Sequence, residues 1–176
     1  MNYDVLIIGA GPGGIYSAYE LTQRCPEKKV AVIEAGHALS HRHCPINGEK
    51  VKTCIGCKTC SIMSGFGGAG AFSDGKYNIT NDFGGTLFEY IGKRQALELM
   101  RYVDEINMRY GGAGTKLYTT AGTQFKKACI QHDLHLLDAS VRHLGTDINY
   151  VVLENLYNYL KDKVDFFFDT PVEKVE

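Results

Sequence analysis

The stretch that decides the fold is Val5-Leu6-Ile7-Ile8-Gly9-Ala10-Gly11-Pro12-Gly13-Gly14. Its first four residues are apolar and mostly β-branched, which predicts a buried strand. The Gly-x-Gly-x-x-Gly spacing then predicts a tight turn, and residues 15–24 continue as a helix that Pro26 ends. The apolar run of residues 30–33 predicts a second strand, buried on both faces of a parallel sheet. Together these segments form one βαβ unit.

Each part of this fingerprint has a role in dinucleotide binding. Gly9 permits the turn, Gly11 lets the backbone approach a pyrophosphate, and Gly14 lets helix and strand pack closely. The helix N-terminus offers free N–H groups and a partial positive charge to phosphates. Glu34, twenty residues after Gly14, would accept hydrogen bonds from ribose hydroxyls and repel a 2′-phosphate, which disfavours NADP. A glycine-rich turn that binds nothing is the alternative.

The rest of the chain completes an α/β fold, a Rossmann-like domain with a parallel sheet in strand order 3-2-1. The other predicted elements are helices over 86–110, 119–131 and 147–163, an extended segment over 134–141 and a strand over 164–168. Residues 35–85 follow neither the helical nor the strand period. A loop of that length indicates function or disorder, and its glycines and cysteines favour function.

Glycines gather in two places, with four of the twenty in residues 9–14 and seven in residues 65–85. Glycine costs backbone entropy and is retained where the chain turns sharply or approaches a ligand closely. The second cluster therefore predicts a second backbone-lined binding surface, with a mobile surface loop as the alternative. A Walker A motif at Gly70 to Lys76 is rejected, because Tyr77 stands where Ser or Thr would hold magnesium.

Charge and hydropathy restrict the partners. Nineteen basic against twenty acidic residues leave a net charge of -1, which argues against nucleic acid or anionic lipid as the main partner. No apolar run approaches the ~18 residues of a membrane helix, and the N-terminus lacks the basic region of a signal peptide. We therefore expect a cytoplasmic protein whose partner is a small-molecule substrate or a redox partner, not a nucleic acid or a membrane.

Four cysteines form a cluster of candidate metal ligands: Cys44, Cys54, Cys57 and Cys60. Three of them follow the Cys-x-x-Cys-x-x-Cys spacing of a ferredoxin ligand run, which favours a [4Fe-4S] cluster. A tetrathiolate zinc site needs the same ligands, and redox-active or structural thiols stay open, since spacing alone does not choose the metal. Cys25 and Cys129 are interpreted as packing residues.

Several motifs together resemble a known family. Residues 4–14 and 30–34 are similar to the N-terminus of the two-dinucleotide-binding-domain flavoproteins. The stretch from Arg42-His43-Cys44-Pro45 to Gly67-Gly68-Ala69-Gly70-Ala71-Phe72-Ser73-Asp74-Gly75-Lys76 resembles a branch of FAD-dependent dehydrogenases, as do residues 143–147 and 170–175. Because proteins of that branch are longer, residues 1–176 would be the N-terminal portion of an FAD-binding domain. Residues 35–85 would be an insertion and 86–145 a helical segment.

The resemblance implies FAD as the cofactor. It also implies that the backbone of residues 67–70 runs along the flavin, where its N–H groups would stabilise the reduced ring. The resemblance further implies that backbone groups of Val172 contact the edge of the adenine ring. Arg42 follows Glu34 closely enough to reach the pyrophosphate, and an exposed arginine on a loop is the alternative. The expected cofactor residues are Gly9, Ala10, Gly11, Pro12, Gly13, Gly14, Glu34, Ala35, Arg42, Gly67, Gly68, Ala69, Gly70 and Val172. No catalytic residue is assigned, and His143 is a substrate-pocket candidate or a surface residue.

The expected function is therefore flavin-dependent electron or hydride transfer by an FAD-dependent oxidoreductase, with an iron-sulfur cluster as an additional candidate. Two other functions stay open. One is a non-catalytic nucleotide- or metal-binding fragment with a zinc ion on four cysteines, and the other is an NAD-binding domain without flavin.

Overall fold

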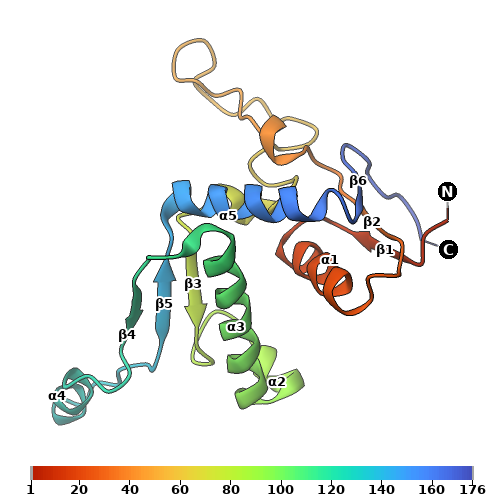
Figure 1. Ribbon diagram of the computed structural model, residues 1–176. Helices are drawn as coiled ribbons and strands as arrows, with labels where there is room; N and C mark the ends of the chain where they lie inside the picture. Colours follow the sequence, from red (N-terminus) through yellow and green to blue (C-terminus); the bar gives the residue numbers. More distant parts are fainter. Residues whose placement is uncertain (1, 176) are drawn as a thin grey trace. The chain divides into compact units, whose positions relative to one another are not determined.

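The computed structural model describes residues 2–175, which fall into two compact units. The first unit is Met1–Ser73 with Tyr150–Glu176, and the second is Asp74–Asn149. Figure 1 shows a sheet in each, with β1 and β2 beside α1 in the first unit and β3, β4 and β5 beside α3 in the second. In the described part of the chain, no helix has the length and apolar character needed to cross a membrane.

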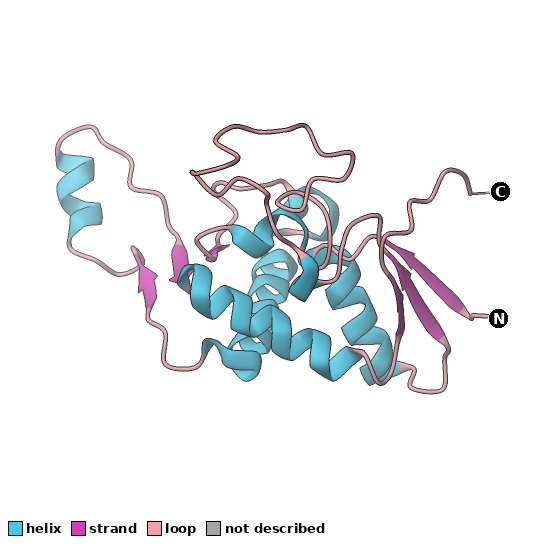
Figure 2. Cartoon of the chain, turned by 90° about the horizontal axis from the view of Figure 1, so that it is seen from above, coloured by secondary structure: helices cyan, strands magenta, loops and turns pink. Residues whose placement is uncertain are grey.

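The first unit contains the parallel sheet, whose strands run in the order β1-β2-β6. Figure 2 shows the strands of this sheet in magenta, near the marked ends of the chain. Its elements are β1 (Val5–Ile8), α1 (Pro12–Arg24), β2 (Val30–Ile33), the short 3-10 helices η1 (Leu39–His41) and η2 (Gly68–Phe72), the later part of α5 (Gly145–Leu160) and β6 (Asp165–Phe167). The third strand therefore lies beside the second, which confirms the predicted 3-2-1 order and the α/β fold class.

The apolar core of the first unit explains the central strand. Val30, Ala31 and Val32 of β2 are buried, because β2 has a strand on each side. Strand β1 differs from the prediction of a buried strand, since Leu6 and Ile8 are 52% and 55% exposed. The reason is that β1 lies at the edge of the described sheet, and its alternate side chains point away from the face on which α1 lies.

The second unit contains an antiparallel sheet in the order β3-β5-β4. Its elements are β3 (Lys76–Ile79), α2 (Leu87–Ile91), α3 (Lys93–Asn107), the π-helical turn η3 (Met108–Gly112), β4 (Leu117–Thr119), α4 (Phe125–Gln131), β5 (Ser140–His143) and the first residues of α5. The single helix predicted over 86–110 is wrong at Gly92, which has φ +82 and divides α2 from α3. Gly111, with φ +135, ends the helical run as predicted.

Strands β3 and β4 were not predicted, and β5 overlaps the predicted extended segment over 134–141 only at residues 140–141. Strand β3 lies inside residues 35–85, and β4 and β5 lie inside residues 86–145, which are therefore not a purely helical segment. Similarly, α4 begins at Phe125, six residues later than predicted. The sequences of β3, β4 and β5 lack the continuous apolar run that identified β1 and β2, so tertiary pairing decides their conformation.

Candidate functional site

The turn between β1 and α1 shows why this motif needs particular glycines. Gly9 has φ +97 and donates its N–H to the Ile33 carbonyl at 2.7 Å. A Cβ at Gly14 would lie 1.9 Å from the Gly9 carbonyl oxygen and 3.3 Å from Cγ2 of Ile7. The fold itself therefore requires glycine at position 14, as the motif predicted for close packing of helix and strand.

Gly11 and Gly13 differ from Gly14 because the fold does not require them. A Cβ at either position would meet nothing within 4 Å, and neither has a positive φ. The N-terminus of α1 has Pro12 in its first turn, no side-chain cap and no acidic residue. Its first-turn N–H groups and partial positive charge are therefore available to an anion. The open space at Gly11 and Gly13 leaves room for the predicted pyrophosphate contact, which stays a prediction.

Glu34 joins three backbone segments. Its side chain is buried, with Oε2 accepting from the Ala10 N–H at 2.7 Å and Oε1 accepting from Gly36 and Gly65 at 2.7 and 3.0 Å. A carboxylate accepts about four hydrogen bonds, so little capacity is left for the predicted ribose contact. Glu34 thus holds the first glycine cluster beside the start of the second, while the neighbouring Ala35 is exposed.

The structure brings the two glycine clusters together. Gly67, in the left-handed region at φ +89, donates its N–H to the Ala10 carbonyl at 2.8 Å. A Cβ at Gly68 would lie 3.3 Å from Cα of Gly11. Loop and turn therefore approach each other at backbone distance, and they form one continuous glycine-lined surface.

This arrangement divides the four predicted flavin contacts into two kinds. The N–H groups of Gly67 and Gly68 donate to the carbonyls of Ala10 and Gly65 at 2.8 Å, so both are used inside the protein. Ala69 and Gly70 are exposed, and a Cβ at Gly70 would meet nothing within 4 Å. Ala69 and Gly70 are therefore the two members of this set whose predicted flavin contact stays open.

Phe66 anchors the second cluster in the core. Its ring is fully buried and makes edge contacts with Tyr157 and Phe166 at centroid distances of 5.2 and 5.8 Å. Such aromatic pairs contribute about 0.5–1.5 kcal/mol beyond area burial. The glycine loop is thus fixed by a ring that points into the unit. Phe66 and Gly36 were not among the predicted residues, although a lone aromatic between glycines was a usable signal.

Arg42 lies inside the loop, and the exposed alternative weighed for it is wrong. Only 2% of its surface is exposed. Its guanidinium donates to the carbonyls of Ser61, Ile62, Phe66 and Gly68 at 2.7–2.8 Å. Burial lowers the pKa of Arg42, and the Glu34 carboxylate partly offsets that effect. With four of its five N–H donors used, at most one is left for the predicted pyrophosphate contact.

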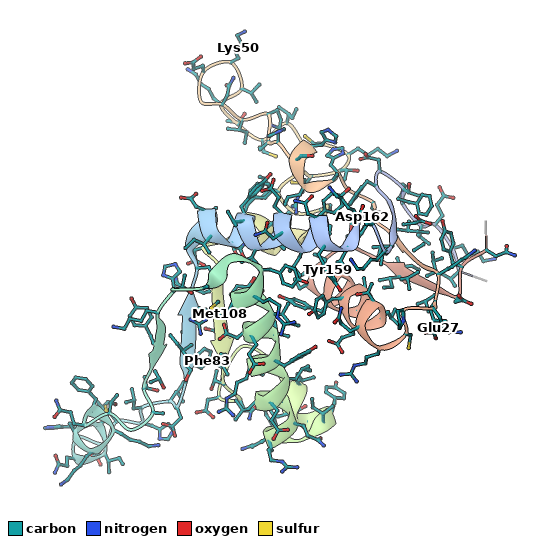
Figure 3. All side chains as sticks on the ribbon, in the orientation of Figure 1. Glu27, Lys50, Phe83, Met108, Tyr159 and Asp162 are labelled. Atoms are coloured by element: carbon teal, nitrogen blue, oxygen red, sulfur yellow. The ribbon has the colours of Figure 1, made fainter. Side chains whose placement is uncertain are left out.

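The four cluster cysteines lie in an exposed loop. Cys44, Cys54, Cys57 and Cys60 are all exposed and unbridged. Among residues 2–175 no group of three or more His, Cys, Asp or Glu side chains is arranged to hold a metal ion. Figure 3 labels Lys50 near the far end of this loop. The thiols, as placed here, do not fit an iron-sulfur cluster or a zinc ion.

Asn47 forms a tight turn at the tip of the cysteine loop, residues 44–60. Its side-chain oxygen accepts from the N–H groups of residues 49–51 at 3.0–3.1 Å. This contact organises the loop tip only, because it reaches neither the cysteines nor the core.

A hollow of about 730 Å³ lies at the other end of the parallel sheet. It is lined by residues at the amino ends of β2 and β6 and the carboxyl end of α1: Asn2, Tyr3, Thr22, Cys25, Pro26, Glu27, Lys28, Lys29, Val30 and residues 161–165. Ligands of open parallel sheets bind at the carboxyl ends of the strands. We therefore assign the candidate site to the glycine clusters and not to this hollow.

Two further predicted residues come from other segments of the chain. Val172 is 39% exposed, in the segment after β6. His143 is exposed at the end of β5 and pairs in register with Lys76 of β3. Lys76 also forms an ion pair with Asp74 at 2.6 Å, and the resulting hydrogen bond lowers the pKa of Asp74. The roles of Val172 and His143 stay predictions.

The second unit has a buried polar pair that was not predicted. Arg142 of β5 donates from Nε and Nη2 to the two carboxylate oxygens of Asp104 at 2.6 and 2.8 Å. The pKa of Arg142 is raised by this hydrogen bond, and burial raises the pKa of the adjacent Tyr77. This largely buried bidentate pair is a structural tie between β5 and α3.

Comparisons with known proteins give a family. A family model described as pyridine nucleotide-disulphide oxidoreductase matches residues 3–128. An uncharacterized protein of Acanthamoeba polyphaga mimivirus is 50% identical over 42 residues, 24% of this chain and 8% of that protein.

The comparison with solved structures found two L-amino acid deaminases among its matches. L-Amino acid deaminase from Proteus myxofaciens in complex with anthranilate is 15% identical with a TM-score of 0.39, covering 99% of this chain and 40% of that chain. The Proteus vulgaris deaminase, with its specific insertion sequence deleted, is 15% identical with a TM-score of 0.37, covering 96% and 45%. The chain thus spans less than half the length of these structures.

Proposed function

The chain belongs to the pyridine nucleotide-disulphide oxidoreductase family, and on that premise we propose that it binds FAD and takes part in flavin-dependent electron or hydride transfer. The observation that carries this proposal is the joining of the two glycine clusters, through the 2.8 Å hydrogen bond from Gly67 to Ala10. One glycine turn would serve any dinucleotide. A second exposed backbone segment beside it supports a longer ligand.

The residues divide the work along such a ligand. The first turn of α1 would stabilise the negative charge of the pyrophosphate with its N–H groups and partial positive charge. Glu34 would hold the turn and the loop at a fixed separation. Ala69 and Gly70 would present backbone to the ring system. FAD, when bound, supplies the redox chemistry, and the chain supplies binding, orientation and electrostatics.

An NAD-binding domain without flavin is the second candidate, since the first glycine cluster serves both cofactors. The joined loop favours FAD over NAD, because NAD binding to this fingerprint needs only the turn, the helix N-terminus and the acidic residue. A non-catalytic nucleotide- or zinc-binding fragment is the third candidate. A metal on the cluster cysteines is supported by their spacing alone, and no electron-transfer step is assigned to it.

The test is the visible absorption spectrum of the protein purified under anaerobic conditions, with chromatography of the nucleotide released by heat. We expect a two-banded flavin spectrum and released FAD. Released NAD or a protein without nucleotide that also fails to bind added FAD would overturn the proposal. Elemental analysis of the same sample for iron and zinc separates the metal alternatives.

A matched pair of variants locates the binding surface. Gly13→Ala adds a methyl group to open space beside the first-turn N–H groups, so we expect at least about a tenfold weaker FAD affinity, about 1.4 kcal/mol. Ser17→Ala lies on the same helix, one turn farther on, and is exposed, so its affinity should equal that of the wild type. If both variants bind FAD as tightly as the wild type, the pyrophosphate does not bind at Gly13.

A further inference from the structure

Arg42 holds the glycine loop by its backbone. The cation is buried, and its four hydrogen bonds all go to main-chain carbonyls, those of Ser61, Ile62, Phe66 and Gly68. These acceptors span the approach to the loop and its first residues. One side chain thus fixes eight consecutive residues against η1, the short helix that Arg42 follows.

The surrounding residues make room for this cation. A Cβ at Gly65 would lie 2.7 Å from Cδ of Arg42 and 2.5 Å from the His37 carbonyl oxygen, so glycine is required there. The guanidinium also lies 4.8 Å from the centroid of the Phe72 ring, at the end of η2. Arg42 therefore contacts the loop at its beginning, its middle and its end.

We propose that Arg42 is the positioning residue of the cofactor site, which sets the exposed Ala69–Gly70 backbone beside the first glycine cluster without itself binding the pyrophosphate. This inference rests on the proposed FAD function and deepens it. A planar guanidinium offers five donors in a fixed fork, which suits several carbonyls at once. Its effect on affinity would come through preorganisation. The apparent affinity of a ligand falls in proportion to the fraction of molecules whose loop is in the binding conformation.

The proposal separates two parts of the ligand. The adenosine diphosphate part would contact the α1 N-terminus, which Arg42 does not touch in its described hydrogen bonds. The flavin part would contact the loop that Arg42 orders. Loss of Arg42 should therefore weaken FAD and leave ADP unaffected, whereas loss of a pyrophosphate ligand should weaken both.

The experiment uses full-length protein freed of its nucleotide, with the variants Arg42→Lys and Arg42→Met, and measures the dissociation constant of FAD and of ADP competing with FAD. We expect FAD to bind at least about tenfold more weakly and ADP to change by less than about twofold. Arg24→Lys is the matched control, since Arg24 is exposed on α1 and forms an ion pair with Glu20 on the same helix. Equal weakening of FAD and ADP, or no weakening of either, would overturn the proposal.

Amide hydrogen exchange without ligand gives a second readout, which also covers a variant that is too unstable for binding studies. In Arg42→Lys, residues 61–72 should lose protection while β1 and β2 keep theirs. Unchanged protection of residues 61–72 would contradict the positioning role. If the wild type binds no FAD, the proposed function fails, and the exchange experiment still decides whether Arg42 orders the loop.

Discussion

The long segment between β2 and β3 contains two loops that are held in opposite ways. Residues 61–72 are fixed by the Arg42 guanidinium, the Glu34 carboxylate and the Phe66 ring, all of them buried. Residues 44–60 are exposed except at two positions of intermediate burial, and the Asn47 turn organises only the tip. Each loop has a motif that predicts a binding site, a glycine cluster in residues 61–72 and a cysteine cluster in residues 44–60.

The difference shows what a motif needs in order to become a site. The glycines form a surface because buried groups from neighbouring elements hold their backbone at fixed distances. The cysteines have the spacing of metal ligands but no comparable anchors, so the structure does not bring them together. Spacing therefore supplies the ligands, whereas contacts outside the motif supply the geometry.

The largest effect is expected for the anchor of the glycine loop. Phe66→Ala removes a fully buried ring and should lower the free energy of unfolding by about 3–5 kcal/mol, as is usual for buried aromatic residues. Ile55→Ala in the cysteine loop, 62% exposed, should change it by less than about 0.5 kcal/mol. Denaturant unfolding measures both, and comparable losses would refute the difference between the loops.

Two adjacent glycines should respond with opposite sign. Gly14→Ala forces a methyl group against the Gly9 carbonyl and should cost about 1–3 kcal/mol of unfolding free energy, as overpacking does. Gly13→Ala meets open space at an ordinary φ and should add about 0.4–1 kcal/mol by restricting the unfolded chain. Thermal unfolding of the two variants tests this. A loss of stability in both would mean that the fold requires glycine at position 13 as well.

Limited proteolysis should separate the loops directly. Trypsin is expected to cleave first after Lys50, Lys52 or Lys58, because exposed loop tips are cut without unfolding. Cleavage after the buried Arg42 should be at least roughly tenfold slower, because it needs local opening. Mass spectrometry of the fragments identifies the order. Early cleavage after Arg42 would contradict its role as the buried residue that positions the glycine loop.

The smallest effect on stability is expected for the exposed ion pair between Lys76 and Asp74, which serves as a comparison for the buried contacts. The hydrogen bond from Lys76 lowers the pKa of Asp74, so its contribution is present at neutral pH and is lost as the pH falls through the folded-state value. Lys76→Met should raise the Asp74 pKa toward its ordinary value in an NMR titration, and Lys52→Met should leave it unchanged. Neither should shift unfolding at neutral pH, since exposed pairs contribute little.

The sequence predicted the βαβ unit well because long apolar runs and a glycine fingerprint report local geometry. The roles of Gly9 and Gly14 followed from the motif and are visible in the turn. The role of Arg42 could not be predicted, because its acceptors are main-chain carbonyls about 20 residues away that any sequence would supply. The Arg142–Asp104 pair was missed for a similar reason, since its partners are 38 residues apart and lie in no motif.

The central claim is that the two glycine clusters form one FAD surface, and hydrogen exchange with and without added FAD tests it most directly. We predict that FAD protects the amides of Gly11, Gly13 and Gly14 together with those of residues 69–70, with no change in residues 44–60. Protection of residues 11–14 alone, or protection confined to another part of the chain, would contradict it.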